Sequence, residues 1–333
     1  MAQRILPSAL YRALAGPYHF FLALTAAVFY GFPSRSLTII AVTGTNGKTT
    51  VVHLLHEIIA SAGIPVGSVS SLRFKVNDGA EPNLLKMTMP GRLALQRFLA
   101  SCRSAGCRYV ILEVTSEGVG QHRHRFIRFA GGVLTNVTPE HLEAHGNFVR
   151  YRNAKIELFR LLRSGGSAIL NREDPSAEHF AKATRADVTW YDHGAIELAR
   201  VGHPVRVLAV SPRVIKLEVD TVYLEAALGG DFNVMNILAA TATALAFGVS
   251  LAAVRQGLSR AGTIPGRLEY VCEQPFAVVV DYAHTPDALE KVYTALKNQE
   301  PENREQEPGT RTQGTSLVCV LGAAGGGRDK WKR

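Results

Sequence analysis

The chain has 333 residues, enough for two domains, and 47% of them are hydrophobic, which is sufficient to build buried cores. Its formal net charge of +9 favours polyanionic ligands such as nucleotides. No run of basic residues is interleaved with aromatic ones, so a nucleic-acid partner is not expected. The four cysteines have spacings that fit neither a disulfide framework nor a zinc site, and reduced thiols indicate a cytoplasmic protein.

The N-terminal segment, residues 1–35, contains one strongly apolar stretch at residues 20–30. This stretch is too short to cross a bilayer, and no convincing signal-peptide cleavage site follows it. We expect a helix that packs on the body of the protein and no firm membrane span. Peripheral contact of this helix with a membrane is the alternative.

A glycine-rich loop follows the apolar strand candidate at residues 37–42 and precedes a helix candidate at residues 51–60. The loop reads Gly44-Thr45-Asn46-Gly47-Lys48-Thr49-Thr50. Its glycines let backbone N–H groups close around the β- and γ-phosphates of a nucleotide, while Lys48 supplies a cation and the Thr49 hydroxyl can bind Mg²⁺. Two residues separate its glycines where the usual phosphate-binding loop has four, so this is a shortened variant.

Short apolar strands then alternate with helical stretches, which predicts an α/β fold with a mostly parallel sheet and helices on both faces. The strand candidates are residues 109–114, 132–135, 168–170 and 188–191. The helix candidates are residues 92–105, 148–162, 175–183 and 233–246. Residues 205–225 alternate apolar and polar side chains, which predicts antiparallel hairpins at a sheet edge.

A domain boundary is predicted near residues 262–266, where Pro265 and two glycines interrupt the pattern. It divides a first α/β domain, residues 36–263, from a second α/β unit, residues 264–333. In the second unit we expect strands at 277–280 and 317–321, a helix at 286–296 and a disordered polar loop at 298–316. About 70 residues with so few elements cannot bury a proper core, so we expect the second domain to be cut off.

Five spaced motifs follow the glycine-rich loop. They are Glu113-Val-Thr-Ser-Glu-Gly118; Thr135-Asn-Val-Thr-Pro-Glu-His-Leu-Glu-Ala-His-Gly146 with Lys155 beyond it; Gly230-Asp-Phe-Asn233-Val-Met-Asn236; Pro265-Gly-Arg-Leu-Glu269; and Asp281-Tyr-Ala-His-Thr-Pro-Asp287. In this order they closely resemble the Mur ligases, the ATP-dependent amide-forming enzymes of bacterial cell-wall synthesis. The nearest type is MurE, which adds diaminopimelate or lysine to UDP-N-acetylmuramoyl-alanyl-glutamate.

The resemblance covers residues 36–333 and implies a phosphate-loop middle domain followed by the start of a Rossmann-like C-terminal domain. It also implies a two-step reaction. A substrate carboxylate attacks the γ-phosphate of ATP to give an acyl phosphate, and an amine then displaces phosphate to form the amide. Because both reactants are negatively charged, the site needs metal ions and cations.

Catalytic and metal-binding roles follow from the resemblance for Lys48, Thr49, Glu113, His141 and Lys155. Glu113 would bind one Mg²⁺ and His141 a second. Lys155 would be carbamylated by CO₂, which turns a cation into a carboxylate-like metal ligand. Without the resemblance, Glu113 is a surface carboxylate at a strand end, His141 a structural histidine and Lys155 a solvated helix residue.

The remaining implied contacts divide by ligand. The positions that match the ATP site across the domain junction are Asn233, Arg267, Asp281 and His284. Those that match contacts to the UDP-muramoyl peptide are Thr88, Thr115, Gln121 and Arg123, and Arg328 matches a contact to the incoming amino acid. From the residues alone, Asn233 is equally a helix cap, Arg267 a surface charge and Arg328 part of a glycine-rich turn.

The sequence departs from the family pattern at several points. Glu117 stands where the family usually has histidine, and Met89 replaces the second threonine of a Thr-Thr pair. About 35 residues stand in place of the usual uridine-binding domain. Two alternatives therefore stay open: another amide ligase of the superfamily, of the folylpolyglutamate or cyanophycin type, and a non-catalytic nucleotide-binding subunit.

Overall fold

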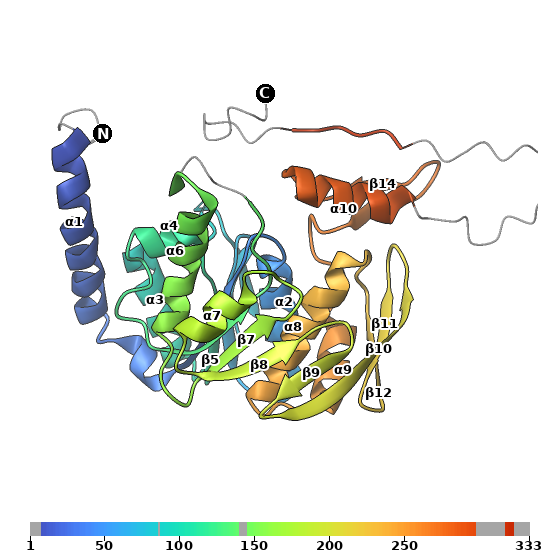
Figure 1. Cartoon of the computed structure of the whole chain (residues 1–333), viewed down its shortest axis with the longest axis horizontal. Helices are drawn as coiled ribbons and strands as arrows, with labels where there is room; N and C mark the ends of the chain where they lie inside the picture. Colours follow the sequence, from blue (N-terminus) through green and yellow to red (C-terminus); the bar gives the residue numbers. More distant parts are fainter. Residues whose placement is uncertain (1–7, 86, 140–144, 298–316, 323–333) are drawn as a thin grey trace, which may run out of the picture.

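The computed structural model describes residues 8–85, 87–139, 145–297 and 317–322. One twelve-stranded sheet runs through it in the order β12-β11-β10-β9-β8-β7-β6-β1-β5-β2-β3-β4 (Figure 1). Its central strands are all parallel: β2 (Val66–Val69), β5 (Tyr109–Glu113), β1 (Thr38–Thr43), β6 (Phe129–Leu134), β7 (Ser167–Asn171) and β8 (Asp187–Tyr191). The predicted parallel core is confirmed, because each strand candidate named above overlaps one of these strands.

Antiparallel strands extend the sheet at both edges. Beyond β2 lie β3 (Arg73–Val76) and β4 (Gly79–Pro82). Beyond β8 lie β9 (Ala195–Leu198), β10 (Val201–Val210), β11 (Ile215–Val219) and β12 (Val222–Ala226). The hairpins predicted at residues 205–225 are confirmed, whereas β2, β3, β4 and β9 were not predicted.

Helices cover both faces of the sheet (Figure 1). One face carries α2 (Lys48–Ser61), α8 (Phe232–Ala246) and α9 (Leu251–Ala261), and the other carries α3 (Arg92–Ser104), α6 (Phe148–Arg160) and α7 (Ala177–Ala183). Strand β1 contributes side chains to the hydrophobic core on each face of the sheet. Ile40 and Val42 lie in the core beneath α2, α8 and α9, whereas Ile39 and Ala41 lie in the core beneath α3, α6 and α7. The helix predicted at residues 51–60 and the four predicted at 92–105, 148–162, 175–183 and 233–246 are confirmed, whereas α9 and the short α4 (Ser116–Gly120) were missed.

The predicted N-terminal helix is also present. It is α1 (Ser8–Phe29), followed by a short 3₁₀ helix, η2 (Pro33–Ser36). Helix α1 lies on the flank of the body beside α3 and buries Ala23, Ala26 and Ala27 there (Figure 1). None of the helices in the described part of the chain has the length and apolar character that crossing a bilayer requires.

The C-terminal segment forms a small antiparallel pair, β13 (Glu269–Cys272) with β14 (Val278–Val280), and then α10 (Pro286–Lys297). The strand predicted at 277–280 and the helix at 286–296 are confirmed. The strand predicted at 317–321 is wrong: those residues are exposed and join neither sheet. An apolar run becomes a strand only beside a hydrogen-bonding neighbour, and the only described strand paired with β14 is β13. The loop predicted at 298–316 lies outside the described residues.

Candidate active site

The glycine-rich loop connects the end of β1 to the start of α2, at the edge where the parallel strands end. Two of its glycines are required by close approach. A Cβ on Gly44 would lie 1.9 Å from Thr135 Oγ1, and one on Gly47, whose φ is +83°, would lie 2.1 Å from Asn236 Oδ1. The loop backbone is therefore wedged against two other segments of the fold at the N-terminus of α2, where helix N–H groups favour anions.

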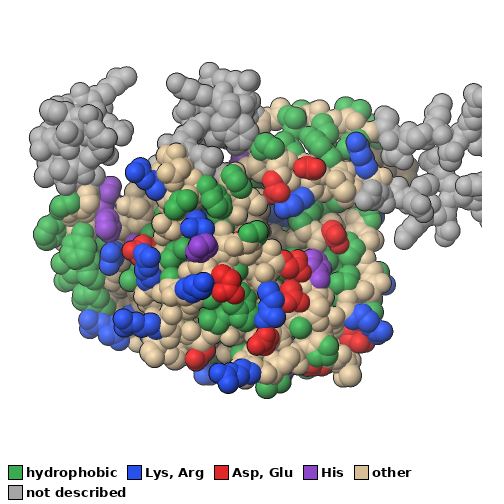
Figure 2. All heavy atoms as spheres, viewed as in Figure 1, with side chains coloured by type: hydrophobic (Ala, Val, Ile, Leu, Met, Phe, Trp, Pro, Cys, Tyr) green, Lys and Arg blue, Asp and Glu red, His purple; other side chains and the backbone are tan. Residues whose placement is uncertain are grey.

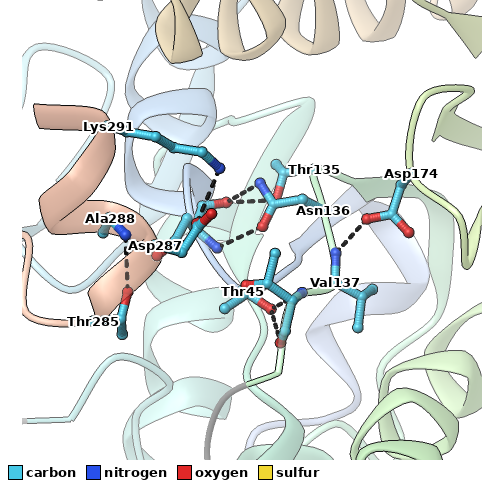
Figure 3. Close-up of polar contacts among 11 residues, drawn as sticks. Thr45, Thr135, Asn136, Val137, Asp174, Thr285, Asp287, Ala288 and Lys291 are labelled. Carbon is cyan, nitrogen blue, oxygen red and sulfur yellow. Dashed lines mark hydrogen bonds and ion pairs between the residues drawn. The ribbon is translucent and has the colours of Figure 1, made fainter. Parts of the chain in front are cut away.

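The segment after β6 fixes the shape of this loop (Figure 3). The Asn46 amide donates to Asn136 Oδ1 at 2.9 Å, the Thr135 hydroxyl donates to the Asn46 carbonyl at 2.6 Å, and the Thr45 amide donates to the Asn136 carbonyl at 2.8 Å. Thr135 and Asn136 open one of the motifs quoted above, yet neither was assigned a role. Their position directly after a strand of the parallel sheet was the available signal.

Asp174, which follows β7, holds the next part of that segment (Figure 3). Its Oδ2 accepts from the Val137 amide at 2.5 Å, and its Oδ1 accepts from the Ser176 amide at 2.7 Å. Burial raises the pKa of the Asp174 carboxyl above its ordinary value, although these two hydrogen bonds act in the opposite direction. Asp174 thus acts as a structural brace behind the loop.

Two lysines meet at one carbonyl oxygen of the loop. Lys48 Nζ donates to the Gly44 carbonyl at 3.1 Å and to the Thr45 carbonyl at 2.8 Å. Lys155 Nζ, from α6, donates to the same Gly44 carbonyl at 2.8 Å. Lys155 is only 2% exposed and its Nζ lies 4.6 Å from the centroid of the Tyr151 ring. The fold thus brings together two lysines that are 107 positions apart in the sequence.

Thr49 and Glu113 form an oxygen-rich pair beside the loop. The Thr49 hydroxyl donates to Glu113 Oε2 at 3.0 Å, and the Ser71 amide donates to the same oxygen at 2.9 Å. The Ser71 and Thr49 hydroxyls are 2.9 Å apart. Hydroxyl and carboxylate oxygens are the ligands that Mg²⁺ prefers. Ser71 was not singled out in the sequence, because it belongs to no quoted motif.

His141 lies outside the described residues, as does Arg328. No group of three or more His, Cys, Asp or Glu side chains is arranged to hold a metal ion within the part of the chain that the structure describes. The candidate metal ligands that can be placed are therefore Thr49, Glu113 and Lys155, all of them on or beside the loop.

Most of the candidate contacts to the acid substrate lie after β5, around α4. The Thr115 hydroxyl accepts from the Gly118 amide at 3.1 Å and caps α4. Arg123 donates to Gln121 Oε1 from NH2 at 2.8 Å and to the Met89 carbonyl from NH1. Thr88, half-buried, is the residue before Met89. Gln121 and Arg123 are thus brought together beside residues 88–89.

The C-terminal candidates form a separate group around Tyr282. Asp281 accepts from the Leu268 amide at 2.8 Å, and the Arg267 guanidinium lies 4.9 Å from the Tyr282 ring centroid. His284 Nδ1 donates to the Tyr282 carbonyl at 2.8 Å. Asn233 lies elsewhere, buried at the start of α8, where its side-chain Nδ2 donates to the Gly229 carbonyl at 2.7 Å.

A cleft of about 740 Å³ lies between the sheet edge, the start of α8 and helix α10. Its walls include Asn136, Asn236, Asp287 and Lys291. The four candidates just described, Asn233, Arg267, Asp281 and His284, do not line it. Asp287 Oδ2 accepts from Asn46 Nδ2 at 3.3 Å and from Lys291 Nζ at 3.0 Å, so α10 contacts the loop directly (Figure 3). Asp287 ends one of the quoted motifs, and its side chain was overlooked there.

Comparison with protein families gives two matches, which follow one another along the chain. Residues 42–244 match the Mur ligase middle domain, and residues 266–330 match the Mur ligase glutamate ligase domain. The chain belongs to the Mur ligase family. The division between the two matches lies close to the boundary expected near residues 262–266.

Several curated relatives of this Mur ligase chain share one name. The chain is 35% identical to the UDP-N-acetylmuramoyl-L-alanyl-D-glutamate–2,6-diaminopimelate ligase of Geobacillus thermodenitrificans, over 94% of this chain and 62% of the relative. The chain is 36% identical to the enzyme of the same name from Gloeobacter violaceus, over 93% of this chain and 60% of that relative. A solved structure of a ligase with this name is 31% identical, with a TM-score of 0.64, over 78% of this chain and 54% of that one. The chain thus spans about 60% of the length of these curated relatives.

Proposed function

We propose that this Mur ligase chain is an ATP-dependent amide-forming ligase of peptidoglycan precursor synthesis. It would join an amino acid, diaminopimelate or lysine, to UDP-N-acetylmuramoyl-dipeptide through an acyl phosphate. The observation that carries the proposal is the convergence of Lys48, Lys155 and the Thr49–Glu113 pair on the glycine-rich loop. The names of the relatives support the same reaction.

The loop fits the triphosphate of ATP. Its backbone is held in place by Thr135 and Asn136, so N–H groups at the start of α2 are fixed before any nucleotide arrives. Lys48 now donates to two loop carbonyls, and it needs only a side-chain rotation to donate to phosphate oxygens instead. The adenosine end has room in the cleft beside the loop, whose far wall is α10. Asn233, Arg267, Asp281 and His284 are proposed as further contacts to the nucleotide by family resemblance, although none of them lines this cleft.

The Thr49–Glu113 pair fits one Mg²⁺, and His141 and Lys155 are proposed for a second. Bound Mg²⁺ would screen the repulsion between the substrate carboxylate and ATP. Glu113 is held for this role by the Ser71 amide, which fixes one carboxylate oxygen beside the Thr49 hydroxyl. The pair is thus pre-positioned, and little side-chain order remains to be gained when the ion binds.

Carbamylation of Lys155 is proposed on electrostatic grounds as well as by family resemblance. Two ammonium groups that share the Gly44 carbonyl repel each other inside a largely buried site. The neutral amine of Lys155 can add to the carbon of CO₂ and lose one proton, which leaves a carbamate anion. That product replaces the repulsion with an attraction to Lys48 and supplies an oxygen ligand.

The substrates would meet at this sheet edge. The muramoyl peptide would contact Thr88, Thr115, Gln121 and Arg123, and the incoming amino acid would contact Arg328. ATP and nucleotide-sugar precursors belong to the cytoplasm, which is where we place the reaction. Peripheral membrane contact through α1 is part of the proposal, because Phe21 is 62% and Phe29 77% exposed.

The proposal is tested by phosphate release from ATP with the purified chain. UDP-muramoyl dipeptide with diaminopimelate or lysine should stimulate release, a folate should not, and Lys48→Ala should abolish both nucleotide binding and turnover. Lys182→Ala, an exposed lysine on α7, is the matched control. ATP binding without any ligation would favour the non-catalytic subunit, and intact ATP binding by Lys48→Ala would contradict the assignment of the loop.

A further inference from the structure

A cluster of cationic and imidazole side chains lies where α1, the start of α3 and the turn after α4 come together. We call it the α1 cationic cluster, and its members are His19, Arg92, His122, Arg123, His124 and Arg125. Figure 2 shows hydrophobic side chains on the α1 flank, bordered by histidine and by Lys or Arg. The family resemblance assigned a substrate contact to Arg123 alone, and α1 lies before the first family match.

Hydrogen bonds join several members of the cluster into one unit. Arg92 NH2 donates to the Gln121 carbonyl, while Arg123 NH2 donates to the Gln121 side-chain oxygen at 2.8 Å. The His122 and His124 rings are stacked, with centroids 6.4 Å apart and 18° between their planes. Both guanidinium groups are therefore fixed around one residue, next to the proposed substrate contacts.

The cluster contains nitrogen atoms that lack partners. His19 Nδ1, Arg92 Nε, His122 Nδ1, His124 Nδ1 and Arg125 Nε are all buried, and none has a hydrogen-bond partner among the residues described. Each such atom lowers the stability of the folded state, because it loses its water partners and gains none in return. A native protein normally satisfies buried polar groups, so several of them in one place need an explanation, and a ligand that accepts hydrogen bonds supplies one.

Negative charge near the cluster is sparse among the described residues. In the described part of the chain, none of its three arginines makes an ion pair, and the carboxylate whose charge acts on Arg123 is Glu117. Burial, and then the charges of Arg92, His122 and Arg123, lower the pKa of His19. Burial and the charge of Arg123 lower the pKa of Arg92 as well. Same-sign charges are thus held close together, and an anion between them would remove the repulsion.

The backbone at this turn is also unusual. His122 has φ of +55°, in the left-handed region that few residues other than glycine adopt. Strained conformations cluster at functional sites, and His122 is one of eight non-glycine residues with positive φ in the described part of the chain. This conformation directs the chain from α4 into the turn at residues 122–125. The turn contributes Arg123, His124 and Arg125 to the α1 cationic cluster, besides His122 itself.

We propose that the α1 cationic cluster binds a phosphate or diphosphate group, with His19, Arg92 and His122 donating to its oxygens. Donors that come from three separate segments suit a tetrahedral anion with several acceptor oxygens better than a planar carboxylate. The group can come from two sources. One is the diphosphate of a nucleotide-sugar substrate, which rests on the proposed function; the other is the head group of an anionic lipid, next to the exposed apolar side chains of α1.

The first test uses calorimetric titration of the full chain with pyrophosphate. All variants carry Lys48→Ala, so that the glycine-rich loop does not contribute to the measured binding. Arg92→Gln and His19→Gln should each weaken binding about tenfold, the loss expected for one charge-assisted hydrogen bond. Arg92→Lys should keep part of the affinity. Arg97→Gln, an exposed arginine on the same helix, should change nothing, and circular dichroism checks that every variant is folded.

The second test uses vesicles of phosphatidylcholine with and without phosphatidylglycerol, in co-sedimentation with the same variants. Pyrophosphate binding that Arg92→Gln weakens supports the site with a soluble source. Binding to phosphatidylglycerol vesicles alone, lost in Arg92→Gln, supports it with a lipid source. If neither ligand binds, or if Arg92→Gln and Arg97→Gln behave alike, the proposal is overturned. None of these readouts needs turnover, so failure of the ligase assay leaves them interpretable.

Discussion

Asn46 Nδ2 donates a hydrogen bond to Asp287 Oδ2 across 3.3 Å, joining the glycine-rich loop to a helix 241 positions later in the chain. The same carboxylate accepts from Lys291 Nζ, one turn further along α10. This contact is where the C-terminal segment meets the loop, and it forms part of the wall of the cleft beside it. If the loop binds ATP as proposed, Asp287 would couple nucleotide binding to the position of α10.

Asp287→Ala should loosen α10 without unfolding the middle domain. Both partners of the Asp287–Lys291 pair are well exposed, so the loss of stability should stay within about 1 kcal/mol. Hydrogen exchange of the α10 amides should become faster, and exchange in α2 should stay unchanged. Glu290→Ala on the same helix is the control. Equal exchange in the two variants would mean that Asp287 does not anchor the helix.

Glu113→Gln should lower ATP turnover about 100-fold or more, because it removes the negative charge beside Thr49 while keeping the shape of the side chain. The Mg²⁺ concentration required for half-maximal turnover should rise in parallel. Glu157→Gln, an exposed carboxylate on α6, is the matched control. Unchanged Mg²⁺ dependence in Glu113→Gln would remove this residue from the metal site.

Lys155 should carry a carbamate when CO₂ is supplied. In ¹³C-bicarbonate the wild-type chain should show one carbamate signal by ¹³C NMR, and Lys155→Gln should lack it and lose turnover. The buried position of this amine on α6 limits exchange with solvent, which favours a persistent adduct. Lys182→Gln controls for exposed lysines. A carbamate signal that survives Lys155→Gln would assign the modification elsewhere.

Stability should fall as the pH is lowered through the range in which His56 would take up a proton. Burial, aided by the charge of nearby Lys75, lowers the pKa of His56 from 6.5 to about 3. Between these values the unfolded chain binds the proton and the folded chain does not, so the unfolding free energy drops by up to about 1.4 kcal/mol for each pH unit. The stability that the neutral His56 side chain contributes is fully present above pH 6.5 and is lost as the pH falls toward 3.

Urea unfolding at pH 7 and pH 5, for the wild type and for His56→Gln, measures this effect. Glutamine can keep the donor that His56 Nε2 directs at the Asn77 carbonyl, at 3.3 Å, and it does not titrate. The variant should lose less stability than the wild type between the two pH values. His193→Gln, an exposed histidine, should leave the difference unchanged.

The sequence by itself determined the order of the central elements and the glycine-rich loop. The periodicity of apolar residues within each segment predicts the buried parallel strands and the helices that pack on them. The loop is recognised from glycines at fixed positions. Both signals lie within short stretches of the sequence. The edge strands β3 and β4 were not predicted, because they are short and partly exposed. The apolar stretch at 317–321 predicts a strand, but it pairs with no described strand. Pairing depends on a second segment, which local sequence does not contain.

Only the tertiary structure decided which side chains meet. Lys48 and Lys155 share the Gly44 carbonyl, Ser71 holds Glu113, and Asp287 reaches Asn46, although none of these contacts follows from spacing along the chain. The same holds for the α1 cationic cluster, whose members come from three separate segments. The physical reason is that parallel strands bring their carboxyl ends to one sheet edge whatever their separation in sequence, so distant loops become neighbours only when the sheet has formed.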